Sequence, residues 1–126
     1  MTFQNGGSDM NKKANEMAAI AYDALDEKLG QDIEIIKIDE ISVIADYLVI
    51  ASGNNINQIN AMIDFVDEKL SQAGYTQCRI EGNKHSTWIL MDYGDVIIHV
   101  FSKEDRLFYD LERIWRDGKQ VSREEL

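Results

Sequence analysis

The chain has 126 residues, of which 44% are hydrophobic and 29% charged, and this suits one globular domain whose core needs neither disulfides nor metals. No stretch approaches the roughly 18 consecutive apolar residues of a membrane-spanning helix, and the chain does not begin like a secretory signal. The formal net charge of -10 argues against direct binding to DNA or RNA and favours a basic protein as partner, and solubility alone explains the acidity equally well.

The first predicted element is a helix from Met10 to Leu29, with Gly30 as its C-terminal stop. Residues 1–9 before it are interpreted as a flexible tail. The apolar residues of the helix recur at a spacing that places them on one stripe: Ala14, Met17, Ala18, Ala21, Leu25 and Leu29.

Two strand candidates and a second helix follow. Residues 33–39 are rich in β-branched side chains, and the unbroken apolar stretch within residues 46–53 is typical of a strand covered on both faces. Asn55 and Gln58 resemble a capping box that opens a helix, and the helical spacing of apolar residues then continues until Gly74.

The second half of the chain is predicted to hold three more strands and one more helix. Residues 76–81 form a short strand, and residues 88–102 form two strands joined at Tyr93 and Gly94. A capping signal at Ser102 opens the last helix, and residues 118–126 after it are expected to be a frayed polar tail. The apolar side of that helix is expected to carry Leu107, Leu111, Ile114 and Trp115.

This order of elements predicts a single α/β domain over residues 10–117. Strands separated by helices favour parallel pairing and the hairpin is antiparallel, so the sheet should be mixed, with about five strands and helices packed on it. A lone Cys78 suits a cytoplasmic protein, since small secreted domains usually carry several cysteines. As a strand residue, Cys78 is expected to be half-buried.

The hairpin within residues 88–102 should have two different faces. With Tyr93 and Gly94 as the turn, Asp92 opposes Asp95, Leu90 opposes Ile97, and Trp88 opposes His99. One face is wholly aliphatic and suited to packing under helices: Ile89, Met91, Val96, Ile98 and Val100. The other is chemically mixed, and its composition suits either a protein interface or a surface covered by a second helical layer: Trp88, Leu90, Asp92, Asp95, Ile97, His99 and Phe101.

The sequence resembles the ribosomal silencing factor (Iojap-like) family over nearly its whole length, from about Met10 to Trp115. The matching strings are DYLVIASG at residues 46–53, EG followed by WILMDYGDVIIHVF at residues 88–101, and the pattern R-x-F-Y-D-L-E-R-I-W at residues 106–115. Such long ordered matches are far more specific than a motif of a few residues. The resemblance implies a fold similar to nucleotidyltransferases but without their catalytic motif.

It also implies a function without turnover or cofactor. Members of the family bind the large ribosomal subunit through its fourteenth protein, uL14, block joining of the small subunit and repress translation when nutrients are limiting. Ribosomal protein uL14 is basic, which agrees with the acidity of this chain. An exposed apolar face would also allow the free protein to form a homodimer.

The residues expected to bind the partner follow from the family match together with the face assignment. We expect Trp88, Leu90, Asp92, Asp95 and His99 to make contacts, with Phe101 as a hydrophobic neighbour. Further matching positions are Tyr93, Arg106, Tyr109 and Glu112, and Tyr109 and Trp115 suit core packing as well as contact. If His99 lies beside Asp92 and Asp95, it should protonate more readily and titrate near neutral pH.

Catalytic alternatives are less well supported by the sequence. A nucleotidyltransferase needs a Gly-Ser loop with carboxylates for divalent metal; Ser52 and Gly53 are present, but no D-x-D or D-x-E lies on a following strand. A zinc site from Cys78, His85 and His99 lacks any ligand spacing, and nothing local marks Cys78 as the nucleophile of a Cys-His dyad. An assembly factor for the large subunit would use the same docking site as a silencing factor.

Overall fold

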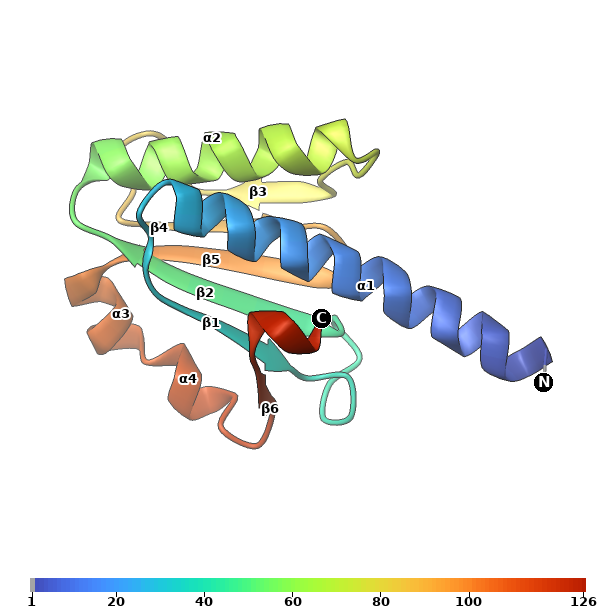
Figure 1. Ribbon diagram of the computed structural model, residues 1–126. Coiled ribbons are helices and arrows are strands. Elements are labelled where there is room, and N and C mark those ends of the chain that lie inside the picture. Colours follow the sequence, from blue (N-terminus) through green and yellow to red (C-terminus); the bar gives the residue numbers. More distant parts are fainter. Residues whose placement is uncertain (1) are drawn as a thin grey trace.

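The computed structural model describes the backbone of residues 2–126 and the side chains of residues 12–126. The elements in chain order are α1 (Thr2–Glu27), β1 (Gln31–Lys37), β2 (Tyr47–Gly53), α2 (Ile56–Gln72), β3 (Arg79–Glu81), β4 (Trp88–Asp92), β5 (Val96–Ser102), α3 (Lys103–Tyr109), α4 (Leu111–Ile114), β6 (Lys119–Val121) and the short 3-10 helix η1 (Arg123–Glu125). Helix α1 begins at Thr2, ahead of the predicted start at Met10, and its first part projects beyond the sheet (Figure 1).

The strands form one mixed sheet in the order β3-β4-β5-β2-β1-β6. Strand β2 runs parallel to β5, while β1, β3, β4 and β6 pair antiparallel with their neighbours. The α/β prediction with a mixed sheet is therefore confirmed, and the sheet has six strands where about five were expected. The additional strand, β6, comes from the end of the chain.

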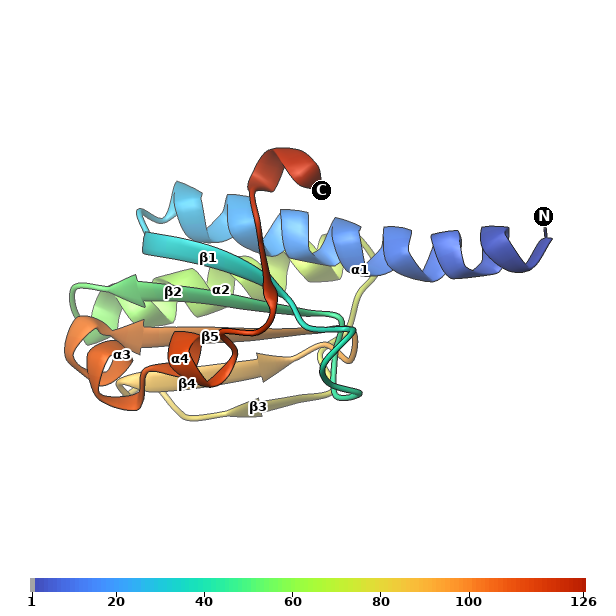
Figure 2. The same cartoon turned by 90° about the horizontal axis from the view of Figure 1, so that it is seen from below.

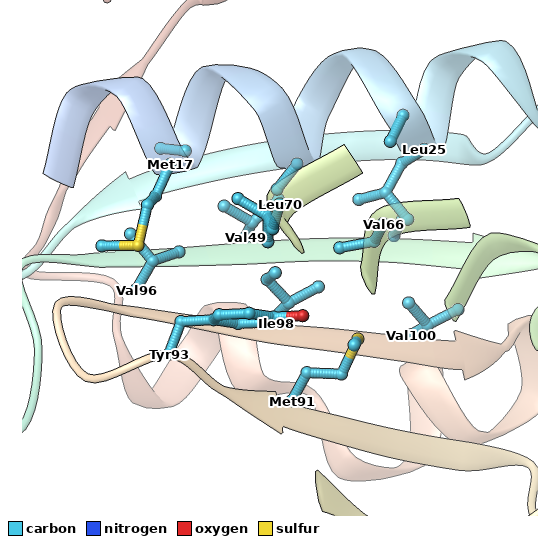
Figure 3. Packing of buried hydrophobic residues seen from close by; sticks show 14 of the residues in the cluster. Met17, Leu25, Val49, Val66, Leu70, Met91, Tyr93, Val96, Ile98 and Val100 are labelled. Atoms are coloured by element: carbon cyan, nitrogen blue, oxygen red, sulfur yellow. The ribbon is translucent and has the colours of Figure 1, made fainter. Parts of the chain in front are cut away.

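Helices α1 and α2 cover one face of the sheet. Both are amphipathic, and their apolar stripes pack on strand residues that alternate toward them, because side chains in a strand point to opposite faces in turn. Figure 3 shows Met17 and Leu25 of α1 and Leu70 of α2 above Val49 and Ile98 in this core. The aliphatic hairpin face predicted from the sequence, Ile89, Met91, Val96, Ile98 and Val100, belongs to it.

The start of α2 is held by side-chain caps, as its sequence predicted. Asn55 has extended backbone, and its side-chain oxygen accepts a hydrogen bond from the Gln58 amide at 2.8 Å. The Gln58 side chain accepts from the amide of Asn54 and donates to the carbonyl oxygens of Lys28 and Leu29. One cap thus ties the beginning of α2 to the end of α1.

The polar end of the chain is ordered, and the prediction of a frayed tail over residues 118–126 is wrong. Strand β6 pairs with β1, placing Val121 beside Ile35. Arg123 donates two hydrogen bonds, of 2.8 and 2.9 Å, to the carboxylate of Asp23 on α1. The polar composition of this segment indicates exposure to solvent rather than disorder. An edge strand is exposed over most of its surface.

Helices α3 and α4 lie on the other face of the sheet (Figures 1 and 2). The predicted continuous helix is broken at Asp110, whose φ of 49° is left-handed and whose amide donates back to the carbonyl of Arg106. The break changes which side chains face the sheet. Leu111 and Trp115 pack against it as predicted, whereas Leu107 and Ile114 are exposed, which corrects the predicted apolar side.

Candidate protein-binding surface

The hairpin of β4 and β5 has the predicted faces but a different register. Gly94 and Asp95 form the turn, and Gly94 has the positive φ of 84° that glycine adopts without strain. Trp88 consequently pairs with Phe101, Leu90 with His99, and Asp92 with Ile97. The predicted pairing of Asp92 with Asp95 is wrong. A shift of two positions leaves every side chain on its predicted face, because the side-chain period of a strand is two.

Trp88 and His99 are joined on the mixed face. The indole Nε1 of Trp88 donates a hydrogen bond to Nδ1 of His99 at 3.0 Å. His99 is buried, and burial lowers the pKa of its imidazole to about 4. The expectation that His99 titrates near neutral pH beside two carboxylates is therefore wrong: its ring stacks on Phe101 and bonds to Trp88.

Tyr93 lies on the opposite face from these residues. It is buried in the core under the helices, and its hydroxyl donates to a carboxylate oxygen of Asp67 at 2.8 Å. Burial and this hydrogen bond raise the pKa of the Tyr93 hydroxyl. Asp95 is half-exposed in the turn, where its carbonyl oxygen accepts from the amides of Asp46 and Tyr47. Tyr93 therefore anchors the turn within the core.

An exposed group of apolar side chains on α3 and α4 continues the mixed face. Tyr109 packs on Trp88 with ring centroids 4.5 Å apart, and Phe108 meets Tyr109 edge-on at 5.1 Å. Leu107 is 83% exposed and Phe108 80% exposed. Exposed apolar patches of this kind mark interaction sites more often than isolated exposed side chains do. We call the following residues the aromatic surface: Trp88, Leu90, Leu107, Phe108, Tyr109 and Ile114.

Reasoning from the sequence missed Leu107, Phe108 and Ile114 as surface residues. A signal was available at residues 107–109, where three large apolar side chains stand in a row. A helix that packs on one face cannot bury three consecutive side chains, because successive residues are rotated by about 100° around its axis. The break at Asp110 then decides that all three are exposed.

Arg106 is buried between two carboxylates at the end of the sheet where β2 and β5 end. Its Nη2 lies 2.8 Å from Glu34, and its Nε lies 2.8 Å from Glu112. Its Nη1 donates to the carbonyl of Gln31 at 3.2 Å and to the hydroxyl of Ser52 at 3.4 Å. Arg106 thus joins α3, α4, β1 and β2, which gives it a structural role.

The ion pair with Arg106 changes the pKa of Glu112. Burial raises the pKa of its carboxyl, but the hydrogen bond from Arg106 and other hydrogen bonds outweigh burial, so that its pKa is lowered. Glu112 therefore remains a carboxylate at neutral pH and accepts from the guanidinium of Arg106. Both family-matching residues serve the attachment of α3 and α4 to the sheet.

An open cleft of about 730 Å³ lies at this same end of the sheet. It lies at the carboxyl end of the parallel strands, which is where α/β folds often bind ligands. Its lining includes Asp32 and Glu34 of β1, which form a D-x-E pattern beside Ser52 of β2. This pattern lies on the strand before Ser52, whereas a nucleotidyltransferase was expected to carry it on a following strand. The guanidinium of Arg106 binds Glu34, and therefore competes for the charge that a divalent cation would need.

Metal and thiol chemistry find no support among the side chains of residues 12–126. No group of three or more His, Cys, Asp or Glu residues in this range could hold a metal ion. Cys78 is exposed and precedes β3, contrary to the predicted half-buried strand position, while His99 is buried in β5. Strand β4 lies between β3 and β5, so the two residues belong to separated parts of the sheet.

Fold and surface together define a mixed-sheet α/β domain with an exposed aromatic surface beside an ordered hairpin. The family described as "Ribosomal silencing factor during starvation" matches residues 11–126, and the chain belongs to this family, whose members regulate translation by silencing ribosomes. The chain is 36% identical over 109 residues to ribosomal silencing factor RsfS of Bacillus subtilis, covering 86% of this chain and 91% of that protein. It is 41% identical over 101 residues to RsfS of Zymomonas mobilis, covering 80% of this chain and 76% of that protein.

Solved structures agree with this assignment. The crystal structure of a Chromobacterium violaceum protein superposes with a TM-score of 0.78 at 31% identity, covering 85% of this chain and 88% of that one.

A more distant mouse protein, "Mitochondrial assembly of ribosomal large subunit protein 1", is 29% identical over 97 residues, and this chain spans 41% of its length. Within the described residues, no helix is both long and apolar enough to cross a membrane.

Proposed function

We propose that this protein represses translation in the cytoplasm when nutrients are limiting. It binds the large ribosomal subunit through ribosomal protein uL14 and so prevents the small subunit from joining. The observation that supports this proposal best is the aromatic surface, where Trp88, Tyr109 and Phe108 form a contiguous row of rings with the last two exposed. Aromatic side chains are enriched among the residues that dominate binding energy at protein interfaces.

The charge of the chain supports a basic partner. Around the hairpin, Asp92 is half-exposed and Glu81 is exposed on the same side of the sheet as Trp88 and Leu90. With a net charge of -10, the chain attracts a basic surface at long range and accelerates encounter with it. The apolar rings then supply the desolvated contact that gives affinity.

The structure divides the family-matching residues by accessibility. Contacts are proposed for half-exposed or exposed side chains: Trp88, Leu90, Asp92, Asp95 and Tyr109. The remaining candidates, Tyr93, His99, Phe101, Arg106 and Glu112, hold the hairpin and α3 in place, since they are buried or bonded within the protein. We add Leu107, Phe108 and Ile114 to the proposed contacts because they are exposed beside Tyr109.

The experiment is cosedimentation with isolated large subunits. Phe108→Asp places a charge in the aromatic surface while removing no buried contact, and it should abolish cosedimentation. The matched control is Val43→Asp, because Val43 is fully exposed in the loop between β1 and β2, at the end of the sheet away from α3 (Figures 1 and 2). It should cosediment like wild type. Full retention of binding by Phe108→Asp would overturn the assigned surface.

A second candidate function is assembly of the large subunit, and the similarity to the mouse assembly protein favours it. Both functions use the same docking site, so binding alone does not separate them. Purified subunits mixed with the protein and resolved on a sucrose gradient do separate them. Reduced joining supports silencing, whereas undiminished joining by a protein that still binds the large subunit supports assembly. Neither function requires a cofactor or turnover.

A further inference from the structure

Strand β3 leaves one edge of the sheet open. It is the last strand in the order β3-β4-β5-β2-β1-β6, and all three of its residues are exposed. In Figure 2, β3 lies at the margin of the domain, with β4 as its neighbour in the sheet. An edge strand presents unpaired amide and carbonyl groups that can bind another strand.

Hydrogen bonds in the hairpin determine which backbone groups of β3 are directed outward. The amide of Tyr93 donates to the carbonyl of Val96, so the preceding residue, Asp92, directs its backbone groups away from β5 and toward β3, because successive strand residues bond to opposite sides. Asp92 pairs there with Arg79, whose backbone groups therefore point to β4. The next residue, Ile80, directs both its amide and its carbonyl to the open edge.

A groove of about 600 Å³ lies between β3 and α2 on the helix-covered face of the sheet. Ile80 is 45% exposed and lines this groove together with Ile56 and Ile63 of α2. Asn60 of α2 donates a hydrogen bond of 2.8 Å to the carbonyl of Lys84, which ties the loop after β3 to the helix. A side chain that enters the groove from the edge therefore meets isoleucines held by a helix and a strand.

Edge and groove together fit an extended peptide segment. In an antiparallel pair, the residue directly opposite Ile80 would exchange two main-chain hydrogen bonds with it. Its side chain would lie on the same face as that of Ile80 and enter the groove, where an aliphatic group is buried against the isoleucines. Backbone pairing at a sheet edge supplies affinity in this mode of recognition, and the pocket for one side chain supplies specificity.

The charges on the other face of β3 indicate what flanks the aliphatic residue. Arg79 and Glu81 both point to that face, since they alternate with Ile80. The guanidinium of Arg79 lies 3.2 Å from Glu81 and 3.9 Å from Asp92, so one cation is shared between two carboxylates. A basic residue opposite Glu81 would complete the pairing of charges, and the net charge of -10 attracts it at longer range.

We propose that β3 and the groove beside α2 bind an extended segment of another protein, antiparallel to β3, with an aliphatic residue opposite Ile80 and a basic residue opposite Glu81. The inference goes beyond the proposed function, because it assigns a second binding site at the edge of the sheet. The basic residue precedes the aliphatic one in the partner, since an antiparallel segment reaches Glu81 before Ile80.

The first test uses the synthetic peptide acetyl-Thr-Thr-Lys-Val-Thr-Thr-amide and the isotope-labelled full chain. Titration should shift the backbone amide signals of Ile80 and Glu81 in nuclear magnetic resonance spectra. Methylation of the valine nitrogen removes the donor to the Ile80 carbonyl, and it should weaken binding roughly tenfold or more. The control peptide acetyl-Thr-Thr-Val-Lys-Thr-Thr-amide should also bind more weakly, because its lysine would lie opposite Arg79.

Variants of the protein test the two assigned contacts. Ile80→Lys places a charge in the groove and should abolish the shifts, whereas Val43→Lys, at an exposed position in another loop, should bind as wild type does. Glu81→Lys should weaken binding about fivefold, and a peptide with glutamate in place of lysine should restore it. This exchange of charges between the partners cannot arise from altered folding.

The site is separable from the aromatic surface. Phe108→Asp, which should lose cosedimentation with large subunits, should bind the peptide as wild type does. The proposal is overturned if the methylated peptide binds as tightly as the parent, or if the charge exchange restores nothing. It is also overturned if the signals of Ile80 and Glu81 shift when the concentration of the protein alone is raised, since a second copy of the chain would then occupy the edge.

Discussion

The indole of Trp88 donates a hydrogen bond to Nδ1 of His99 across the two strands of the hairpin, at 3.0 Å. Since an indole nitrogen can only donate, this contact requires Nδ1 of His99 to be unprotonated. Burial acts in the same direction and lowers the pKa of His99 to about 4. The hairpin is therefore built around a neutral imidazole.

This relationship predicts a specific dependence of stability on pH. The pKa of His99 falls from an ordinary value of 6.5 to about 4 on folding, so the unfolded chain binds a proton more readily than the folded one. The contribution of neutral His99 is complete above the ordinary pKa and is lost as pH falls from 6.5 toward 4. Between about pH 7 and pH 5, wild type should lose about 2 kcal/mol of unfolding free energy through this residue.

The measurement is urea unfolding at several pH values, with His99→Asn as the control. The side-chain carbonyl oxygen that this substitution introduces can accept the Trp88 hydrogen bond, but the amide does not titrate. The unfolding free energy of the variant should fall less than that of wild type over the same pH range. Parallel curves for the two proteins would contradict a lowered pKa at His99.

Trp88 should contribute to stability as well as to binding. It is half-buried and packs on Phe101 and Tyr109, with ring centroids 4.9 and 4.5 Å away. Trp88→Ala should lower the unfolding free energy by about 2–3 kcal/mol, because it removes this packing and leaves Nδ1 of His99 without its donor. Trp88→Phe should lower it by only about 1 kcal/mol, because the ring contacts are retained. Urea unfolding of both variants at neutral pH distinguishes these contributions, and equal losses would contradict the packing role.

Arg106 should be essential for the attachment of α3 and α4. Arg106→Met leaves the carboxylates of Glu34 and Glu112 without their common partner, and the unfolding free energy should fall by about 2–3 kcal/mol. This value lies below that of a fully buried pair, since both glutamates are partly exposed. The triple variant with Glu34→Gln and Glu112→Gln should recover part of the loss, because it also removes the unpaired charges. An Arg106→Met protein as stable as wild type would refute the role of this cluster.

Deletion of residues 119–126 should destabilise the domain. The deletion removes β6 and exposes the edge of β1, and it removes Val121 and Leu126, which pack on the core. We expect a loss of about 2–4 kcal/mol in thermal or urea unfolding. Arg123→Ala is the control, because its ion pair with Asp23 is partly exposed and should contribute less than about 1 kcal/mol. A frayed tail would instead leave the unfolding free energy of the truncated chain unchanged.

Much of the fold could be predicted from local sequence patterns. The cap at Asn55, the stripe of apolar residues on α1 and the alternation along the hairpin each depend on neighbours within a few positions. The faces of the hairpin were correct although its register was wrong, because a slip of two residues preserves alternation. The family resemblance was also contained in the sequence, as residues 11–126 match the ribosomal silencing factor family.

The tertiary structure decided what local patterns leave open. A helical stripe predicted that Leu107 faces the sheet, but the left-handed backbone at Asp110 turns the following residues, so that Leu111 packs and Leu107 does not. Likewise, the polar composition of residues 119–121 gave no sign of a strand, since pairing with β1 uses backbone groups that every sequence carries. The amino-acid sequence thus determined the face on which each strand residue lies, because side chains alternate with a period of two. Burial of His99 depended on contacts between separate segments of the chain, which a local period does not encode.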